Sequence, residues 1–344
     1  LRSESRCWFA AAVAAVALTL VGGHSDLSFA AAAGSSEASC CGTARPGDEV
    51  WLVCCRQLPC FSRDNPPPAD VGGRLSYRRY DWESKKWRRL DEGAFSATER
   101  LKLPTTFWVH EDRAEPSVAY SRGWYVYQQL VRGADVEAMR FVIWSWPATK
   151  EIKRRPVQDA QIKAFRVHSA GYYLGWVLNR LEPTTRVGLM GFSFGARVVT
   201  GSLHALAGGE ILGHALPDAG KGPMRRHNAV LMGAALDDDW LLPGRPHGMA
   251  ITQVEKLLLQ NNCRDWILKR YPKLCGRAAL GYVGLHVGGA LAPYADRIRQ
   301  IDAGRYIGII HAIRPYINSQ PLMALTRKYV LVDLLIPAAV SNDS

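Results

Sequence analysis

The segment of residues 191–195, Gly-Phe-Ser-Phe-Gly, constrains the fold of this chain more than any other stretch. A short apolar run, residues 186–190, precedes it, and a helix-like run, residues 196–206, follows it. Strand, sharp turn and helix form the setting of a nucleophile elbow, in which the turn lifts the hydroxyl of Ser193 above a sheet. The two glycines leave room where a Cβ would clash with the neighbouring strand and helix. The alternative is a chance G-x-S-x-G pattern in a glycine-rich loop.

The rest of the chain alternates between strand-like and helix-like segments. We expect strands at 49–55, 105–109, 139–146, 228–232, 251–259 and 297–301, a hairpin at 75–82 and 86–90, and helices at 120–131, 160–181 and 316–332. Repeated β-α-β units predict a doubly wound, mostly parallel sheet with helices on both faces. The length of 344 residues suits one large α/β domain, and no internal repeat or second-domain linker interrupts it.

The N-terminal segment has the order of a secretory signal peptide. Arg2 and Arg6 precede an apolar run over residues 8–21, and small residues follow. The run is shorter than the ~20 residues that a spanning helix needs, so we expect no permanent membrane span. We therefore predict a signal peptide over residues 1–33, cleaved between Ala30 and Ala33, a flexible leader over 34–48, and an α/β domain over 49–344 of an exported protein.

The chain carries a net charge of +12. Its basic clusters are scattered and no nucleic-acid-binding motif accompanies them, so the charge favours solvated basic faces over specific nucleic-acid binding. A polyanion-binding protein is the weaker alternative, and it predicts salt-sensitive retention on heparin.

Eight cysteines are present, and loss of Cys7 with the signal peptide would leave seven. Export would allow them to oxidise, and Cys263 and Cys275 could pair across a short segment. A zinc site at Cys54, Cys55 and Cys60 is disfavoured because no C-x-x-C spacing or neighbouring histidine accompanies them.

A serine nucleophile needs a base and an orienting acid, which in this fold follow it in the order acid, then histidine. His311 follows the last expected strand and is the favoured base, with His286 as the alternative. Asp265 follows the strand before it and is the favoured acid, with Asp237-Asp238-Asp239 as the alternative. Both favoured residues lie at carboxyl ends of strands, where active sites of α/β sheets form.

An oxyanion hole needs two backbone N–H groups. We expect one from Phe194, directly after the nucleophile, and one from Glu111, in the loop after the strand at 105–109. His110 precedes Glu111, and its position suits a structural or oxyanion-loop role better than that of a base.

The chain resembles the secreted bacterial α/β-hydrolase proteins of largely unassigned substrate, near the serine esterase and lipase superfamily. The resemblance runs in consistent order from about residue 49 to the C-terminus, over residues 108–110, 142–147, 191–197, 203–209, 233–235, 262–269, 279–281 and 308–311. It implies Ser193 as nucleophile, Asp265 as acid and His311 as base, in agreement with the order argument. The chain departs from the family in one place: His-Gly is usual after the third strand, and here Glu111 follows His110.

These observations predict an exported serine hydrolase that cleaves a small-molecule or lipid carboxylic ester through an acyl-enzyme, without a metal or organic cofactor. Within the hydrolases, a lipase or an amidase is an alternative. From another class, the alternative is a catalytically weak binding protein of this fold at the cell surface, which Glu111 and the basic surface suggest.

Overall fold

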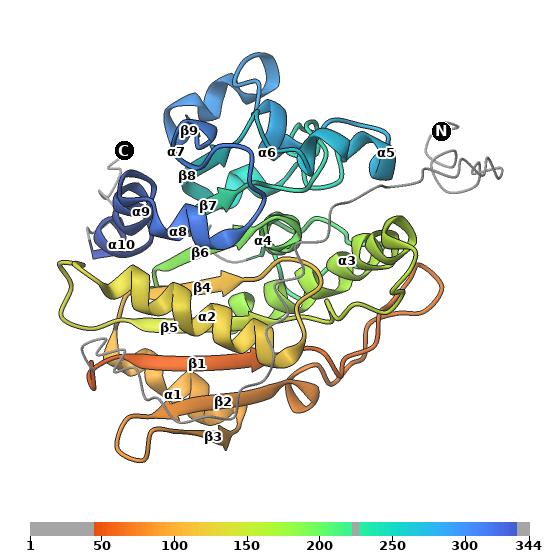
Figure 1. Cartoon of the computed structure of the whole chain (residues 1–344). Helices are drawn as coiled ribbons and strands as arrows, with labels where there is room; N and C mark the ends of the chain where they lie inside the picture. Colours follow the sequence, from red (N-terminus) through yellow and green to blue (C-terminus); the bar gives the residue numbers. More distant parts are fainter. Residues whose placement is uncertain (1–44, 222–226, 336–344) are drawn as a thin grey trace, which may run out of the picture. The chain divides into compact units, whose positions relative to one another are not determined.

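The computed structural model describes residues 45–221 and 227–335. The predicted signal peptide, its cleavage site and most of the predicted leader lie outside the described residues. Nine strands of the described residues form one sheet in the order β3-β2-β1-β5-β4-β6-β7-β8-β9 (Figure 1). They are β1 (Glu49–Cys54), β2 (Ser76–Asp81), β3 (Lys86–Leu90), β4 (Thr105–Val109), β5 (Arg140–Ser145), β6 (Val187–Phe192), β7 (His227–Met232), β8 (Val254–Asn261) and β9 (Ile298–Asp302).

Strand direction places all the candidate catalytic loops at the carboxyl ends of the parallel strands. In the sheet order from β1 to β9 every neighbouring pair is parallel, whereas β2 pairs antiparallel with both β1 and its hairpin partner β3. The loops after β4, β6, β8 and β9 therefore leave the sheet on the same side. The strand β9 pairs with β8 at one end of the sheet and is only partly buried. The predicted fold class is confirmed.

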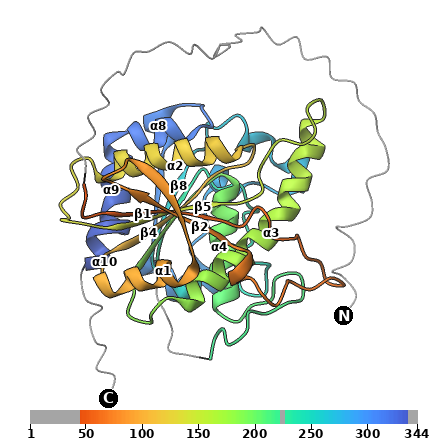
Figure 2. The ribbon, with the colours of Figure 1, turned by 90° about the horizontal axis from the view of Figure 1, so that it is seen from below.

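Helices cover both faces of the sheet, as Figure 2 shows. Successive residues of a strand point to opposite faces, so Phe107 and Val109 belong to one hydrophobic cluster and Trp108 belongs to the other. The first face is covered by α1 (Glu92–Ala97), α3 (Pro156–Arg180) and α4 (Phe194–Leu206), and the second by α2 (Pro116–Val131), α8 (Ile313–Asn318), α9 (Gln320–Arg327) and the π-helical segment η6 (Lys328–Val332). Burial on both faces explains why the central strands are apolar without alternation.

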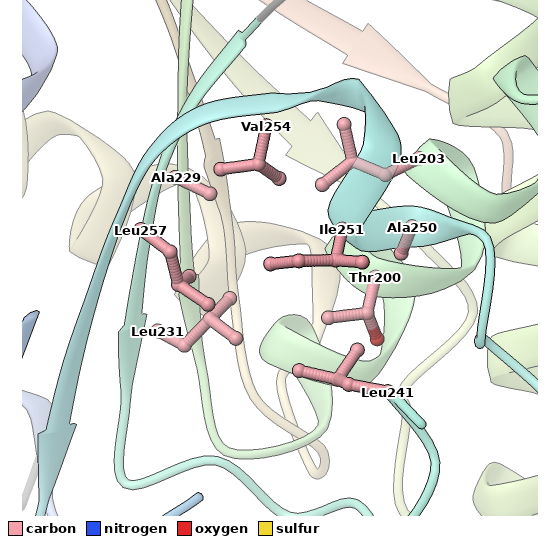
Figure 3. Close-up of a pocket in the computed structure, with 9 residues that line it drawn as sticks. All are labelled: Thr200, Leu203, Ala229, Leu231, Leu241, Ala250, Ile251, Val254 and Leu257. Atoms are coloured by element: carbon pink, nitrogen blue, oxygen red, sulfur yellow. The ribbon is translucent and has the colours of Figure 1, made fainter. Parts of the chain in front are cut away.

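The strand predicted at 251–259 begins later than expected. Residues Ala250–Gln253 form a 3-10 turn, η3, and β8 starts at Val254. The alternation of apolar and polar residues suggested a strand that includes Ile251. Ile251 is buried, but as part of the 3-10 turn, with its side chain beside Leu203 of α4 and Leu231 of β7 at a small apolar cavity (Figure 3). The cavity volume of about 10 Å³ is at the lower limit for one water molecule. Helix α4 therefore packs directly on the sheet.

The predicted helix at 316–332 is divided. Ser319 has an extended backbone (φ −72°, ψ 111°) between α8 and α9, and Pro321 lies in the first turn of α9. A proline lacks the N–H that a continuing helix needs but suits a first turn, where no acceptor is available. Helix α1 was not predicted from the sequence; it is capped by the Asp91 carboxylate, which accepts from the N–H of Ala94 at 2.8 Å.

The cysteine prediction was wrong in one respect. Cys263 and Cys275 are both free, as are Cys54, Cys55 and Cys60. The sulfur of Cys263 faces the carboxylate of Asp302 on β9 at 3.8 Å, whereas Cys275 is half-buried elsewhere, at the end of α5 (Pro272–Cys275). Within residues 45–221 and 227–335, no histidine, cysteine and carboxylate group is arranged to hold a metal ion. No helix in the same part of the chain combines the length and apolarity of a membrane span.

The last residues of the predicted leader belong to the fold. The carboxylate of Asp48 is buried and accepts hydrogen bonds from the Tyr127 hydroxyl at 2.7 Å and from the Met139 N–H at 2.9 Å. Arg45 pairs with the same carboxylate at 2.9 Å. Asp48 thus joins the start of β1 to α2 and to the segment before β5.

We expect Asp48→Ala to destabilise the protein by about 2 to 4 kcal/mol, because two buried donors lose their acceptor. Urea unfolding followed by circular dichroism measures this loss. Glu83→Ala, in the exposed turn of the hairpin, is the control and should change stability by less than about 0.5 kcal/mol. Equal effects of the two substitutions would contradict a structural role for residues 45–48.

Candidate active site

Ser193 is the residue between β6 and α4, and its backbone is strained. Its dihedral angles, φ 54° and ψ −121°, are rarely adopted by residues other than glycine. Such a conformation costs of order 1–3 kcal/mol and persists only where the surroundings fix it. Here the Ser193 N–H donates to the Met232 carbonyl at 3.0 Å, and the Ser193 carbonyl accepts from Ala235 at 3.1 Å.

The two glycines of the motif permit this turn. A Cβ on Gly191 would lie 2.6 Å from the Gly195 carbonyl oxygen and from the Ala196 nitrogen. A Cβ on Gly195 would lie 2.1 Å from the carbonyl oxygen of Val109, at the end of β4. The first turn of α4 therefore touches both the strand before it and the strand beside it, which is the close approach that the sequence analysis expected.

The structure brings Ser193, His311 and Asp265 together. The Nε2 atom of His311 lies 2.9 Å from the Ser193 Oγ, and its Nδ1 atom lies 2.5 Å from Oδ2 of Asp265. An ionised carboxylate only accepts hydrogen bonds, so Nδ1 carries the donated proton and Nε2 is left to accept from the serine hydroxyl. The buried Asp265 is itself oriented, because its Oδ1 accepts from the N–H groups of Ile267 at 2.9 Å and Leu268 at 3.0 Å.

Asn262 joins the two loops that hold the acid and the histidine, and the sequence analysis did not identify it. Its side-chain nitrogen donates to the Gly308 carbonyl at 2.9 Å, and its side-chain oxygen accepts from the Arg264 N–H at 2.9 Å. The Trp266 N–H also donates to the Ile309 carbonyl at 3.4 Å. The bonds to Gly308 and Ile309 connect residues more than forty positions apart, so only the parallel pairing of β8 with β9 reveals them.

The alternative residues lie outside this hydrogen-bonded group. His286 is exposed on the loop after α6 (Leu280–Val283). Asp237 accepts from the Tyr271 hydroxyl at 2.8 Å, and Asp238 pairs with Arg277 at 2.9 Å. The acidic run after β7 is therefore engaged with the segment around α5 (Pro272–Cys275).

The loop after β4 lies against the elbow, since Gly195 touches the end of that strand. Phe194 is in the first turn of α4, where the helix offers its N–H no acceptor. Glu111 does not need the conformational freedom of glycine, because the positive φ in this loop falls on Arg113 (56°) instead.

The side chain of Glu111 is nearly buried and its Oε1 pairs with Arg122 of α2. Burial raises the pKa of Glu111, and the Arg122 guanidinium opposes this change. The Oε2 atom of Glu111 has no hydrogen-bond partner among the described residues. Arg122 was not identified from the sequence, because it lies on a separate helix whose packing places it there.

His110 is buried and fixes the peptide after Glu111. Its ring stacks on Trp146 with centroids 5.5 Å apart, and its Nε2 accepts from the Trp146 N–H at 3.3 Å. Its Nδ1 must then donate, and it reaches the Glu111 carbonyl at 2.7 Å. Burial lowers the pKa of His110 to about 3, so the ring is neutral near pH 7. This arrangement fits a structural role for His110.

No protein-family model matches the chain, and no curated protein matches it. Solved structures that it is similar to include an acetyl xylan esterase (13% identity, TM-score 0.36, 67% of this chain and 99% of that one). They also include a cutinase-like protein from Cryptococcus sp. (12% identity, TM-score 0.30, 67% and 94%) and esterase B from Lactobacillus rhamnosis (12% identity, TM-score 0.36, 85% and 88%).

We expect His110 to make the protein acid-sensitive. Its folded-state pKa is depressed to about 3, whereas the unfolded value is about 6.5, so between these values only the unfolded state binds the proton. The contribution of His110 to the free energy of unfolding is fully present above pH 6.5, and protonation of the unfolded state lowers the free energy of unfolding by about 2 kcal/mol at pH 5. Urea unfolding between pH 4 and pH 8 measures the slope.

The comparison variant is His110→Asn, whose amide nitrogen can still donate to the Glu111 carbonyl but does not titrate. It should be less stable at pH 7 by about 1–3 kcal/mol, because the Trp146 N–H loses its acceptor. Its stability should nevertheless decline less steeply on acidification. An unchanged slope in this variant would contradict the assignment.

Proposed function

We propose that this protein is a serine hydrolase of carboxylic esters, with Ser193 as nucleophile, His311 as base and Asp265 as the orienting acid. The observation that carries the proposal is the continuous pair of hydrogen bonds from Ser193 Oγ to His311 Nε2 and from His311 Nδ1 to Asp265 Oδ2, at 2.9 and 2.5 Å. Three polar side chains from three separate loops meet at the carboxyl ends of parallel strands, where α/β active sites form.

In the first half of the reaction, the Ser193 oxygen attacks the acyl carbon while His311 Nε2 takes the hydroxyl proton. Asp265 holds the ring in the required tautomer and stabilises the imidazolium that forms. The N–H groups of Phe194 and Glu111 bind the oxyanion of the tetrahedral intermediate. His311 then returns its proton to the leaving alcohol, and the acyl group remains on Ser193.

In the second half, His311 takes a proton from a water molecule, which attacks the acyl-enzyme. The carboxylic acid leaves, and the proton returns to Ser193. No step requires a metal ion or an organic cofactor.

Glu111 lies beside the region where negative charge develops, and a free carboxylate there would oppose the reaction. The pairing of Glu111 with Arg122 supports catalysis in spite of this residue, because the guanidinium compensates its charge. The second candidate, a binding protein with little catalysis, is suggested by Glu111 and the basic surface, and the pairing with Arg122 removes the first of these two grounds.

We also propose that the protein is exported, on the basis of the signal-peptide pattern of residues 1–33 alone.

We expect the purified protein to hydrolyse p-nitrophenyl esters, and Ser193→Ala to lower kcat by more than about 10³-fold because the nucleophile is absent. Asp265→Asn should cost about 10⁴-fold, because the histidine tautomer is no longer fixed. Ser202→Ala, which removes another buried serine of α4, is the matched control and should retain activity. A fluorophosphonate probe should label the parent and not Ser193→Ala. A parent protein that neither turns over esters nor takes the label would exclude a catalytic elbow.

We expect Arg122→Gln to lower kcat/KM by about tenfold, because the Glu111 carboxylate is then uncompensated near the oxyanion. The double variant Arg122→Gln with Glu111→Gln should recover to within about threefold of the parent, since the unpaired charge is removed. Steady-state kinetics on one soluble ester gives the coupling, and thermal unfolding checks that each variant folds. Additive losses would mean that Arg122 does not act through Glu111.

A further inference from the structure

Large apolar side chains gather on the two loops that hold the candidate acid and base. Of the eleven exposed large hydrophobic residues in the described part of the chain, five lie there: Trp266, Ile267, Tyr306, Ile309 and Ile310. Single exposed apolar residues are ordinary on a protein surface, but such a concentration marks an interaction site.

These side chains adjoin the catalytic residues in both sequence and space. Trp266 and Ile267 directly follow Asp265, and Ile309 and Ile310 directly precede His311. The hydrogen bond from the Trp266 N–H to the Ile309 carbonyl, at 3.4 Å, joins the two groups into one surface. Ile309 is 61% exposed and Trp266 is 49% exposed, although their neighbours Asp265 and His311 point inward. We call Trp266, Ile267, Ile309 and Ile310 the apolar rim.

Basic residues flank the apolar rim along the chain. The exposed cations on the same two loops and the helices that follow them are Arg264, Lys269, Arg270, Lys273, Arg305 and Arg314. The acids of these segments do not neutralise them, because Asp265 is buried with His311 and only the half-buried Asp302 remains, 3.7 Å from Arg305. Arg270 also supports the rim, with its guanidinium 5.0 Å from the Trp266 ring and 3.0 Å from the Trp266 carbonyl.

We propose that the apolar rim and its cations dock the protein on an anionic lipid surface, so that the ester substrate enters the site from that surface. Because it names a substrate class, this inference rests on the proposed ester hydrolysis. Tryptophan and aliphatic residues enter the boundary between headgroups and acyl chains, and lysine and arginine contact anionic headgroups. A second copy of this chain would bring the same cations face to face, which disfavours self-association as the occupant.

Docking is tested apart from catalysis by using the full-length Ser193→Ala protein. Co-sedimentation is measured with vesicles of phosphatidylcholine alone and of phosphatidylcholine with phosphatidylglycerol in a three-to-one ratio. We expect binding to the anionic vesicles that weakens with added salt, and weaker binding to phosphatidylcholine alone. If Ser193 proves not to be catalytic, this binding measurement still stands, so the two proposals can fail separately.

Two pairs of variants assign the binding to this surface. Ile309→Ser should lower the vesicle partition coefficient about tenfold, because its apolar side chain no longer enters the lipid. The matched control is Leu101→Ser, which should leave the partition coefficient unchanged. Leu101 is equally apolar and 47% exposed, but it lies in η2 (Thr98–Leu101), directly before β4 and therefore at the amino ends of the strands. Lys269→Ala and Lys273→Ala should each cost about fivefold on anionic vesicles, whereas Lys86→Ala on β3 should cost nothing.

Three results would overturn the proposal. The first is no sedimentation with either vesicle. The second is an equal loss in the rim variants and their controls, which would indicate general basic adhesion. The third is a concentration-dependent dimer that Ile309→Ser abolishes without any vesicle binding, because the occupant would then be a second copy. Thermal unfolding of Ile309→Ser verifies that its fold is intact.

Discussion

The close approach of α4 to the ends of β4 and β6 is the constraint on which the site depends. Ser193 keeps its positive φ because the packing of β6 and α4 fixes the turn between them. Gly191 and Gly195 make this close packing possible. The same contact brings the loop after β4 against the first turn of α4. A fold with a looser helix would lose the position of the serine and its surroundings together.

The candidate site could be predicted from the sequence wherever chain order determines position in a parallel sheet. Ser193, Asp265 and His311 each follow a strand, and parallel strands bring their carboxyl ends together. Contacts between side chains on separate elements could not be predicted in this way: Arg122 meets Glu111 only because α2 packs over that loop, and Asn262 meets Gly308 only because β9 lies beside β8. For the same reason the alternating pattern at Ile251 suggested a strand, although a 3-10 turn buries this side chain equally well.

Glu111 illustrates how a local departure from a family pattern depends on its surroundings. It stands where the resemblance leads us to expect glycine, and a glutamate at such a position can introduce both backbone strain and an unfavourable charge. The structure assigns the left-handed conformation to Arg113 and gives the carboxylate a counter-ion, while a neutral His110 bonds the Glu111 carbonyl through one ring nitrogen and the Trp146 N–H through the other. Backbone strain and charge are thus compensated by different residues, none of which could be recognised from the substitution itself.

The position of β9 has a consequence for the activity that we propose. Among the strands that the structure describes, β9 ends the sheet and pairs with β8 alone, and it is partly solvated, yet the loop that carries His311 follows it. Edge elements open locally at a lower free energy than the core of the same domain. Ser193 and Asp265, the proposed nucleophile and acid, are buried, so the proposed base His311 would be the first of the three to leave. Inactivation in mild denaturant would then precede global unfolding, and would reverse on dilution without any refolding of the sheet.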